Sequence, residues 1–393
     1  MTRRTVSILS LVVCASTLIV TGGCSKQEKS PIKIGALYNL QGSQASLDIP
    51  SADGAKLAVK EINGKGGING CQLELVLYDG KTDPEAIKEA ARKLVEIDKV
   101  TAIIGFSDND MVLAAAPIAA TARTVFLTSG ATSPKLPGLV KDYLFLACFG
   151  DNVQAAAGAE YACRNLGLKS AALLTDEKMD YTLLLSNYFK DRFVELGGRI
   201  VLDGTYQGGA RNFSAYISQL KALDKLPDML YVASGPDDIG AIVKELRQAG
   251  FHMPIMGGDA YDTPLLCETA GKYADGVYFT THALLDEKAG TGQSRRFISA
   301  YRDEYKKLPE HAFAALGYDA VCILAEALKK ARPGSAEPIV TALLETRNLS
   351  TVTGEISYEN GSRIPRKSVT VVVIRDGKPA AAAVVMPEKA PAP

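Results

Sequence analysis

Two predicted strands end in loops whose residues could hold the two charges of a small zwitterion. Residues 129–134, Ser-Gly-Ala-Thr-Ser-Pro, follow the strand at 124–128. Their hydroxyl and backbone N–H groups can bind a carboxylate, and the small residues Gly130 and Ala131 let the backbone approach a ligand closely. Asp259 follows the strand at 253–258, where its carboxylate could pair with an ammonium group. The alternatives are an ordinary polar turn for the loop and an isolated surface carboxylate for Asp259.

Two further positions could contribute to the same site. Asn109 lies in the polar loop at 106–110, and its amide could donate a hydrogen bond to a ligand. A helix N-cap at Asn109 or Asp110 is the alternative, and it is compatible with binding. Tyr181 follows the strand at 170–175 and could lie over a ligand, although an aromatic side chain in such a position also serves as a packing residue.

Residues for catalysis or metal binding are sparse. The three histidines, His252, His282 and His311, are scattered, so no nucleophile–base pair can be assigned, and an exported hydrolase is the weakest hypothesis. The five cysteines after residue 30 contain no CxxC pair of the kind that binds zinc. Their odd number leaves at least one thiol unpaired, and both disulfides and buried free thiols are compatible with it. We therefore expect a protein that is not an enzyme and that has neither a metal nor a cofactor.

Short apolar strands alternate with amphipathic helices and must position these loops. The alternation runs over residues 32–128 and starts again at 151. Asp83 is expected to cap a helix that begins at Pro84, and Asp151 with Gln154 to form a capping pair for the next run. Two successive βα runs predict two open, parallel sheets. Ligands bind such sheets at the carboxyl ends of the strands, where the polar loops lie.

The ends of the chain predict export. Arg3 and Arg4 precede an apolar core at residues 6–20, which is shorter than the roughly 20 residues of a membrane span and fits a signal peptide at 1–23. The residues before Cys24 resemble a bacterial lipobox with Thr21 in place of the usual aliphatic residue, so Cys24 is expected to be lipidated. Residues 24–30 form a polar tether, and residues 387–393 a disordered tail rich in Pro and Ala.

Composition excludes several classes of partner. The chain has 44 Lys and Arg against 44 Asp and Glu, and removal of Arg3 and Arg4 leaves 42 against 44, a net charge of −2. This balance gives no reason to expect nucleic acid or a strongly charged surface as partner. A body of this length usually divides into two or more domains.

The ordered set of loops resembles the leucine/isoleucine/valine-binding protein family, the type I periplasmic receptors of branched-chain amino acid ABC transporters. The resemblance covers essentially all of residues 31–380, and no single motif carries it. The supporting stretches are IKIGALYNLQG from Ile32, GAKLAVKEINGKGGING from Gly54, YDGKTDP from Tyr78, FLTSGATSPKL from Phe126, MGGDAYDTP from Met256, GYDAV from Gly317, GEISYENG from Gly354 and VVIRDGKP from Val372.

The resemblance implies an α/β fold of two lobes, each a mostly parallel sheet flanked by helices, joined by three hinge crossings. Lobe one would comprise residues 31–147 and 281–355. Lobe two would comprise residues 148–280 and 356–386.

The resemblance also assigns roles to the loop residues. Gly130, Ala131 and Thr132 match the loop that holds the ligand's α-carboxylate, with Thr132 as the main contact, and Asn109 falls where the family usually has Ser. Asp259 matches the acid that receives the α-ammonium group, and Tyr181 matches an aromatic residue of lobe two. The family's second aromatic residue falls near Ser234 or Gly235, and its Arg near the first crossing is replaced by Cys148-Phe149-Gly150, so the side chain that the ligand carries is left open.

The implied function is that of a lipid-anchored, monomeric, extracytoplasmic binding protein. It would capture an amino acid by hinged closure and deliver it to an ABC permease in the inner membrane. The alternative is a sensory receptor on the same fold, with an amide or an aromatic acid as ligand and a membrane protein as signalling partner.

Overall fold

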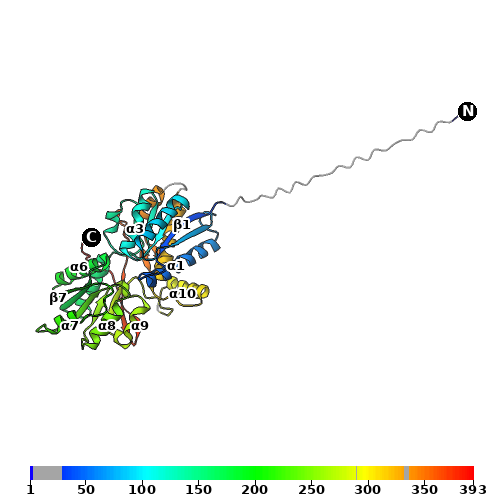
Figure 1. Cartoon of the computed structure of the whole chain (residues 1–393). Coiled ribbons are helices and arrows are strands. Elements are labelled where there is room, and N and C mark those ends of the chain that lie inside the picture. Colours follow the sequence, from blue (N-terminus) through cyan, green and yellow to red (C-terminus); the bar gives the residue numbers. More distant parts are fainter. Residues whose placement is uncertain (3–28, 289, 332–335) are drawn as a thin grey trace.

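The computed structural model describes residues 1–2, 29–288, 290–331 and 336–393. The predicted signal peptide, apart from its first two residues, lies outside the described residues, as do Cys24 and most of the tether. Two lobes lie side by side, and the chain passes between them more than once (Figure 1). None of the described helices is both long and apolar enough to cross a membrane.

The sheet of the first lobe is entirely parallel. Its strand order is β2-β1-β3-β4-β5. The strands are β1 (Ile32–Tyr38), β2 (Leu73–Asp79), β3 (Ala102–Gly105), β4 (Val125–Thr128) and β5 (Leu144–Leu146). Successive residues of a strand enter opposite core clusters, as Ile103 and Ile104 do, so helices must cover both faces.

Two groups of helices cover this sheet. One face carries α1 (Ala45–Gly64), α11 (Ala312–Lys330) and α12 (Glu337–Leu344), and the other carries α2 (Pro84–Arg92) and α3 (Asn109–Thr121). The capping prediction for α2 is confirmed, because Asp83 Oδ1 accepts the backbone N–H of Ala86 at 2.7 Å. The remaining elements of the lobe are a π-helical turn (Lys93–Ile97), α4 (Leu136–Leu139), α10 (Gly292–Tyr305) and the antiparallel pair β11 (Leu349–Thr351) and β12 (Gly354–Ile356).

The sheet of the second lobe is mixed. Its order is β14-β13-β10-β9-β8-β6-β7, parallel from β7 to β10 and antiparallel at β13 and β14. The strands are β6 (Ser170–Asp176), β7 (Arg199–Tyr206), β8 (Met229–Ala233), β9 (Ile255–Gly257), β10 (Val277–Thr281), β13 (Val369–Arg375) and β14 (Lys378–Val385). The helices are α5 (Asp151–Arg164) and α6 (Asp180–Glu195) on one face, with α7 (Ser214–Lys221), α8 (Ile239–Gln248) and α9 (Pro264–Ala270) on the other, and two 3-10 turns (Asp259–Tyr261 and Gly271–Ala274). The predicted two-lobed α/β fold is therefore confirmed.

The third passage between the lobes differs in place from the predicted boundary at 355/356. Ile356 and Tyr358 are buried in the core of the first lobe, and the Tyr358 hydroxyl donates to Leu146 O at 2.7 Å. Leu146 N in turn donates to Arg363 O at 3.0 Å. We therefore propose that lobe two resumes at about residue 367, directly before β13.

The last residues, for which we predicted a disordered tail, contact the second lobe. Asn152 Nδ2 donates to Pro391 O at 2.8 Å, and Arg164 pairs with Glu388 at 2.7 Å. Lys389 pairs with Glu195. These contacts hold a segment without an apolar pattern, which explains why the sequence indicated disorder.

Candidate ligand-binding cleft

One small cavity lies between the lobes at the carboxyl ends of their strands. The first lobe contributes Gln44, Leu47, Ser107, Asp108, Thr132 and Phe313, and the second contributes Met179, Tyr181, Pro236, Asp259 and Ala260. The cavity has a volume of about 20 Å³, which is room for about one water molecule. Three of the predicted site residues, Thr132, Tyr181 and Asp259, thus lie around one space, although Thr132 and Asp259 are far apart in the sequence.

Asp259 is buried, and three side chains hydrogen-bond to its carboxylate. Gln154 Nε2 and the Tyr181 hydroxyl both reach Oδ1 at 2.9 Å. His282 Nε2 lies 3.0 Å from Oδ2. A carboxylate has about four acceptor positions, so Oδ2 retains capacity for one further donor, such as a ligand's ammonium group.

The role predicted for Gln154 from the sequence is wrong. We predicted a capping pair with Asp151, but Gly150 is the N-cap of α5 and no side chain caps it. Gln154 does donate to Asp151 Oδ1 at 3.0 Å, yet it also donates to Asp259, and its Oε1 accepts from Asp259 N at 3.2 Å and from the Thr280 hydroxyl at 2.9 Å. Gln154 therefore anchors Asp259 to the second sheet.

Tyr181 is a packing residue that also lines the cavity, and its contact with a ligand stays a prediction. Its ring is buried in the core between α5 and α6 and the second sheet, and its hydroxyl reaches the cavity beside Asp259. The same hydroxyl accepts from Ala260 N at 3.3 Å. Tyr181 thus fixes both the side chain and the backbone of the turn that carries Asp259.

In the loop after β4, Thr132 lines the cavity. The backbone N–H groups of Gly130 and Ala131, which were also predicted to contact the ligand, instead bond to other groups of the protein. Gly130 N donates to Phe106 O at 3.1 Å, and Ala131 N donates to the Thr128 hydroxyl at 3.1 Å. A Cβ atom at position 130 would lie 2.9 Å from the Phe313 ring, so any larger residue would have to displace that ring. Gly130 and Ala131 shape the loop in this arrangement, whereas Thr132 lines the cavity.

Asn109 does not line the cavity. Its Oδ1 accepts from Ser133 N at 3.0 Å, and its Nδ2 lies 3.5 Å from Asp180 Oδ2 on the second lobe. The N-cap of α3 is neither predicted candidate: Asp108 Oδ1 accepts from Asp110 N and Met111 N. Asn109 therefore fastens the Thr132 loop and contributes a contact between the lobes.

Carboxylates dominate the electrostatics around the cavity. Burial raises the pKa of Asp48 to about 7, that of Asp108 to about 6 and that of Asp151 to about 8. Asp108 and Asp259 both line the cavity, and its lining residues include no Lys or Arg. A ligand with a cationic group is favoured in such surroundings, and a purely anionic ligand is disfavoured.

The raised pKa of Asp151 predicts that its charge destabilises the folded protein at high pH. Below about pH 4 both states hold the proton, and as the pH rises towards 8 the unfolded chain releases it first, so stability falls over this range. We expect Asp151→Asn to lose less free energy of unfolding than the wild type between pH 6.5 and 8.5, by at least about 1 kcal/mol. Urea unfolding at the two pH values measures it.

The same exchange at the exposed Asp224 is the control and should change the pH dependence little. Other buried groups that titrate in or near this window, such as Asp48 and His282, are common to both proteins, so to first order their contributions cancel in the comparison. Parallel curves for Asp151→Asn and the wild type would contradict the prediction.

Several cavity residues gave no sequence signal. Leu47, Met179 and Phe313 are apolar residues near element ends, indistinguishable by type from core residues. Ser107 and Pro236 follow β3 and β8, so the rule that ligands bind at strand ends covers them, but no chemistry singled them out.

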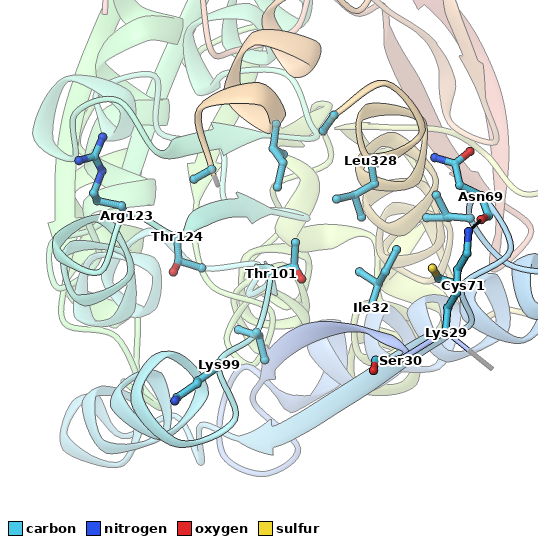
Figure 2. Close-up of a pocket in the computed structure, with 15 residues that line it drawn as sticks. Lys29, Ser30, Ile32, Asn69, Cys71, Lys99, Thr101, Arg123, Thr124 and Leu328 are labelled. Carbon is cyan, nitrogen blue, oxygen red and sulfur yellow. Dashed lines mark hydrogen bonds between the residues drawn. The ribbon is translucent and has the colours of Figure 1, made fainter. Parts of the chain in front are cut away.

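A larger cavity, of about 640 Å³, lies at the opposite edge of the first sheet (Figure 2). It is lined at the starts of β1, β3 and β4 by Ile32, Thr101 and Thr124. The amino ends of parallel strands are not where open α/β sheets bind ligands. Volume alone would select this cavity, but the convergent polar groups lie in the cleft.

Metal and disulfide chemistry find no support in the described part of the chain. No group of three or more His, Cys, Asp or Glu side chains is arranged there to hold a metal ion. Cys71, Cys148, Cys163, Cys267 and Cys322 are free thiols. Of the two alternatives that the sequence left open, the structure therefore has free thiols.

Comparison with known proteins finds similarity to one family over nearly the whole chain. Residues 31–379 match the family model described as periplasmic binding protein. The Leu/Ile/Val-binding protein BraC3 of Rhizobium johnstonii is 26% identical over 375 residues, which cover 95% of this chain and 100% of that protein.

Solved structures agree in fold along nearly their whole length. The leucine-binding protein LivK of Thermotoga maritima is 32% identical with a TM-score of 0.83, covering 91% of this chain and 99% of that one. The branched-chain amino acid binding protein LivJ of Streptococcus pneumoniae, in complex with isoleucine, is 31% identical with a TM-score of 0.83, covering 91% and 100%.

Proposed function

The chain belongs to the periplasmic binding protein family, and from this premise we propose that it captures an α-amino acid, branched-chain or related, for an ABC uptake system. The observation that carries the proposal is the cavity that Asp259 of one lobe and Thr132 of the other both line. The named binding roles of the relatives, for leucine, isoleucine and valine, agree with this chemistry.

The two charges of the ligand's head group would be held by different lobes. The ammonium group would donate to Asp259, whose Oδ2 has acceptor capacity left. The carboxylate would accept from the Thr132 hydroxyl, and Ser107 is a second hydroxyl residue of the first lobe that lines the cavity. Because each lobe holds one charge, the ligand stabilises the state in which both lobes meet.

The remaining surface of the cavity suits an apolar side chain. Leu47 and Phe313 come from the first lobe, and Met179 and Pro236 from the second. The absence of Lys and Arg from the lining residues argues against an aromatic acid without an amino group as the main ligand.

Binding would require the lobes to separate and close again. An amino acid cannot enter a space of about 20 Å³, and both Asn109 with Asp180 and Ala312 N with Asp262 Oδ2 (3.1 Å) join the lobes across the cleft. Hinged opening at the three crossings would expose Thr132, and closure would bring Asp259 onto the bound ligand.

The proposal also includes export and anchoring to the membrane. Cleavage of a signal peptide at 1–23 and lipidation of Cys24 would tether a monomer outside the cytoplasm, next to its permease. A chain without these modifications would still bind its ligand, so the two parts of the proposal can be tested separately.

A thermal-shift screen of the chain from residue 25 tests the binding proposal. We expect one or more L-α-amino acids with aliphatic side chains to raise the melting temperature by a few °C at about 100 times the dissociation constant. The matched 2-hydroxy acids, which lack the ammonium group, and benzoate should give a smaller shift. A shift with these acids and none with any amino acid would refute the proposal.

A further inference from the structure

His282 lies behind Asp259, where the chain leaves the second lobe. It follows Thr281, the last residue of β10, and its side chain is completely buried. Its Nε2 lies 3.0 Å from Asp259 Oδ2, yet it is not among the residues that line the cavity. His282 therefore touches the carboxylate that would bind the ligand, without touching the ligand's space.

The protonation state of His282 makes it a donor. Burial lowers its pKa to about 4, so the ring is neutral at physiological pH. A neutral imidazole has one N–H, and the partner at Nε2 is a carboxylate, which can only accept. The bare nitrogen is then Nδ1, which is buried and has no hydrogen-bond partner in the described part of the chain.

Two aromatic rings fix the imidazole in place. Phe149, from the first crossing, stacks on it with 3.9 Å between ring centroids and 21° between planes. Phe313, at the start of α11 in the first lobe, meets it edge-on at 5.9 Å. The first crossing, through Phe149, and a residue that lines the cavity, Phe313, therefore both pack against the His282 imidazole.

The two carboxylate oxygens of Asp259 accept different numbers of hydrogen bonds from side chains. Oδ1 accepts from both Gln154 and Tyr181, whereas Oδ2 accepts from His282. Oδ2 is also the oxygen with acceptor capacity left for a ligand. In the described part of the chain, His282 is therefore the side chain that holds the oxygen left for the ligand, while Gln154 and Tyr181 hold the other oxygen.

We propose that His282 is a positioning residue that aims Asp259 Oδ2 at the ligand's ammonium group and thereby sets the preference for amino acids over ligands that lack this group. The proposal rests on the proposed function. It assigns to the second crossing a part in ligand selection in addition to its part in the hinge.

Two substitutions separate this role from a purely structural one. His282→Phe keeps an aromatic ring against Phe149 but removes the donor. His282→Gln removes the ring but keeps an N–H donor on a side chain of similar reach. The readout is the ratio of the affinities for the best L-amino acid and for its 2-hydroxy acid, measured by calorimetry on the same sample.

We expect His282→Phe to lower the ratio by roughly 10- to 100-fold, the contribution of one hydrogen bond to a charged group, and His282→Gln to keep it within about threefold of the wild type. Because both affinities come from one sample, the fraction of inactive protein cancels in the ratio. His282→Leu serves as a second variant without a donor if the Phe ring does not fit.

Two results would overturn the proposal. A ratio unchanged in both variants without a donor would show that His282 does not direct Asp259, and a ratio reduced as much by Gln as by Phe would assign His282 a structural role. Equal binding of both ligands by the wild type would instead refute the proposed function, so the two failures are distinguishable.

Discussion

Asp259→Asn is expected to remove nearly all affinity for amino acids. The substitution keeps the shape of the side chain but removes the charge that would pair with the ligand's ammonium group. Truncating one partner of a buried, hydrogen-bonded charge pair costs about 2 to 5 kcal/mol, which corresponds to roughly 30-fold to several thousand-fold in the dissociation constant. Isothermal titration calorimetry with the best amino acid of the screen measures the loss.

Asparagine is a better test than alanine at this position. Gln154, Tyr181 and His282 all donate to Asp259, so alanine would leave three buried donors without an acceptor and lower the stability of the second lobe. Asp176→Asn is the matched control, because Asp176 is a buried acid of the same lobe that does not line the cavity. Unchanged affinity in Asp259→Asn, or an equal loss in Asp176→Asn, would contradict the assignment.

Gly317→Ala is expected to have the largest effect on stability. Gly317 lies on α11 against α1, and a Cβ atom there would lie 1.8 Å from Ser51 O. Gly54 makes the reciprocal contact, with 1.8 Å from its Cβ position to Ala314 O. Two backbones meet at these points, so neither helix can yield by rotating a side chain. We expect a loss of at least about 3 kcal/mol in the free energy of unfolding.

Gly64→Ala provides the control for this prediction. Gly64 is the last residue of α1, and an added Cβ would meet no atom within 4 Å. Alanine is the better helix former, so this exchange should leave stability unchanged or raise it by up to about 1 kcal/mol. Urea unfolding of both variants decides the matter, and a Gly317→Ala protein as stable as the wild type would exclude close contact between α1 and α11.

The reason for glycine at positions 54 and 317 could not be derived from the sequence. Gly54 and Gly317 belong to stretches that supported the family resemblance, but neither lies in a turn, and helix propensity argues against glycine inside a helix. Only the crossing of α1 and α11, which are separated by some 250 residues in the chain, supplies the reason. Packing between distant helices cannot be obtained from local rules.

The position of the cleft could be predicted, because the rule that places ligands at the carboxyl ends of strands depends only on the order of strands and loops. This rule predicted that Thr132, Tyr181 and Asp259 lie close together, and all three line one cavity. The individual contacts could not be predicted. Gln154 reaches an aspartate 105 residues away, and a local capping rule sees only Asp151.

Some predicted element boundaries were wrong because the local sequence is compatible with more than one boundary. The helical spacing of Ala55, Ala58 and Ile62 predicts a first helix that begins at Ser51. In the structure α1 begins at Ala45, and Leu47 of the extra turn lines the cavity. The alternating residues at 354–359 would suit a strand of either lobe, and only the burial of Tyr358 beside Leu146 assigns them to the first.

The central claim is that the cleft recognises a small molecule by its α-ammonium group, and a calorimetric comparison of two ligands tests it most directly. The chain from residue 25 is titrated with the best L-α-amino acid of the screen and, separately, with the 2-hydroxy acid of the same side chain. We predict one binding site with a micromolar dissociation constant, about −8 kcal/mol, for the amino acid and at least tenfold weaker binding of the hydroxy acid. Equal affinity for both ligands, or no binding of any amino acid, would contradict the account.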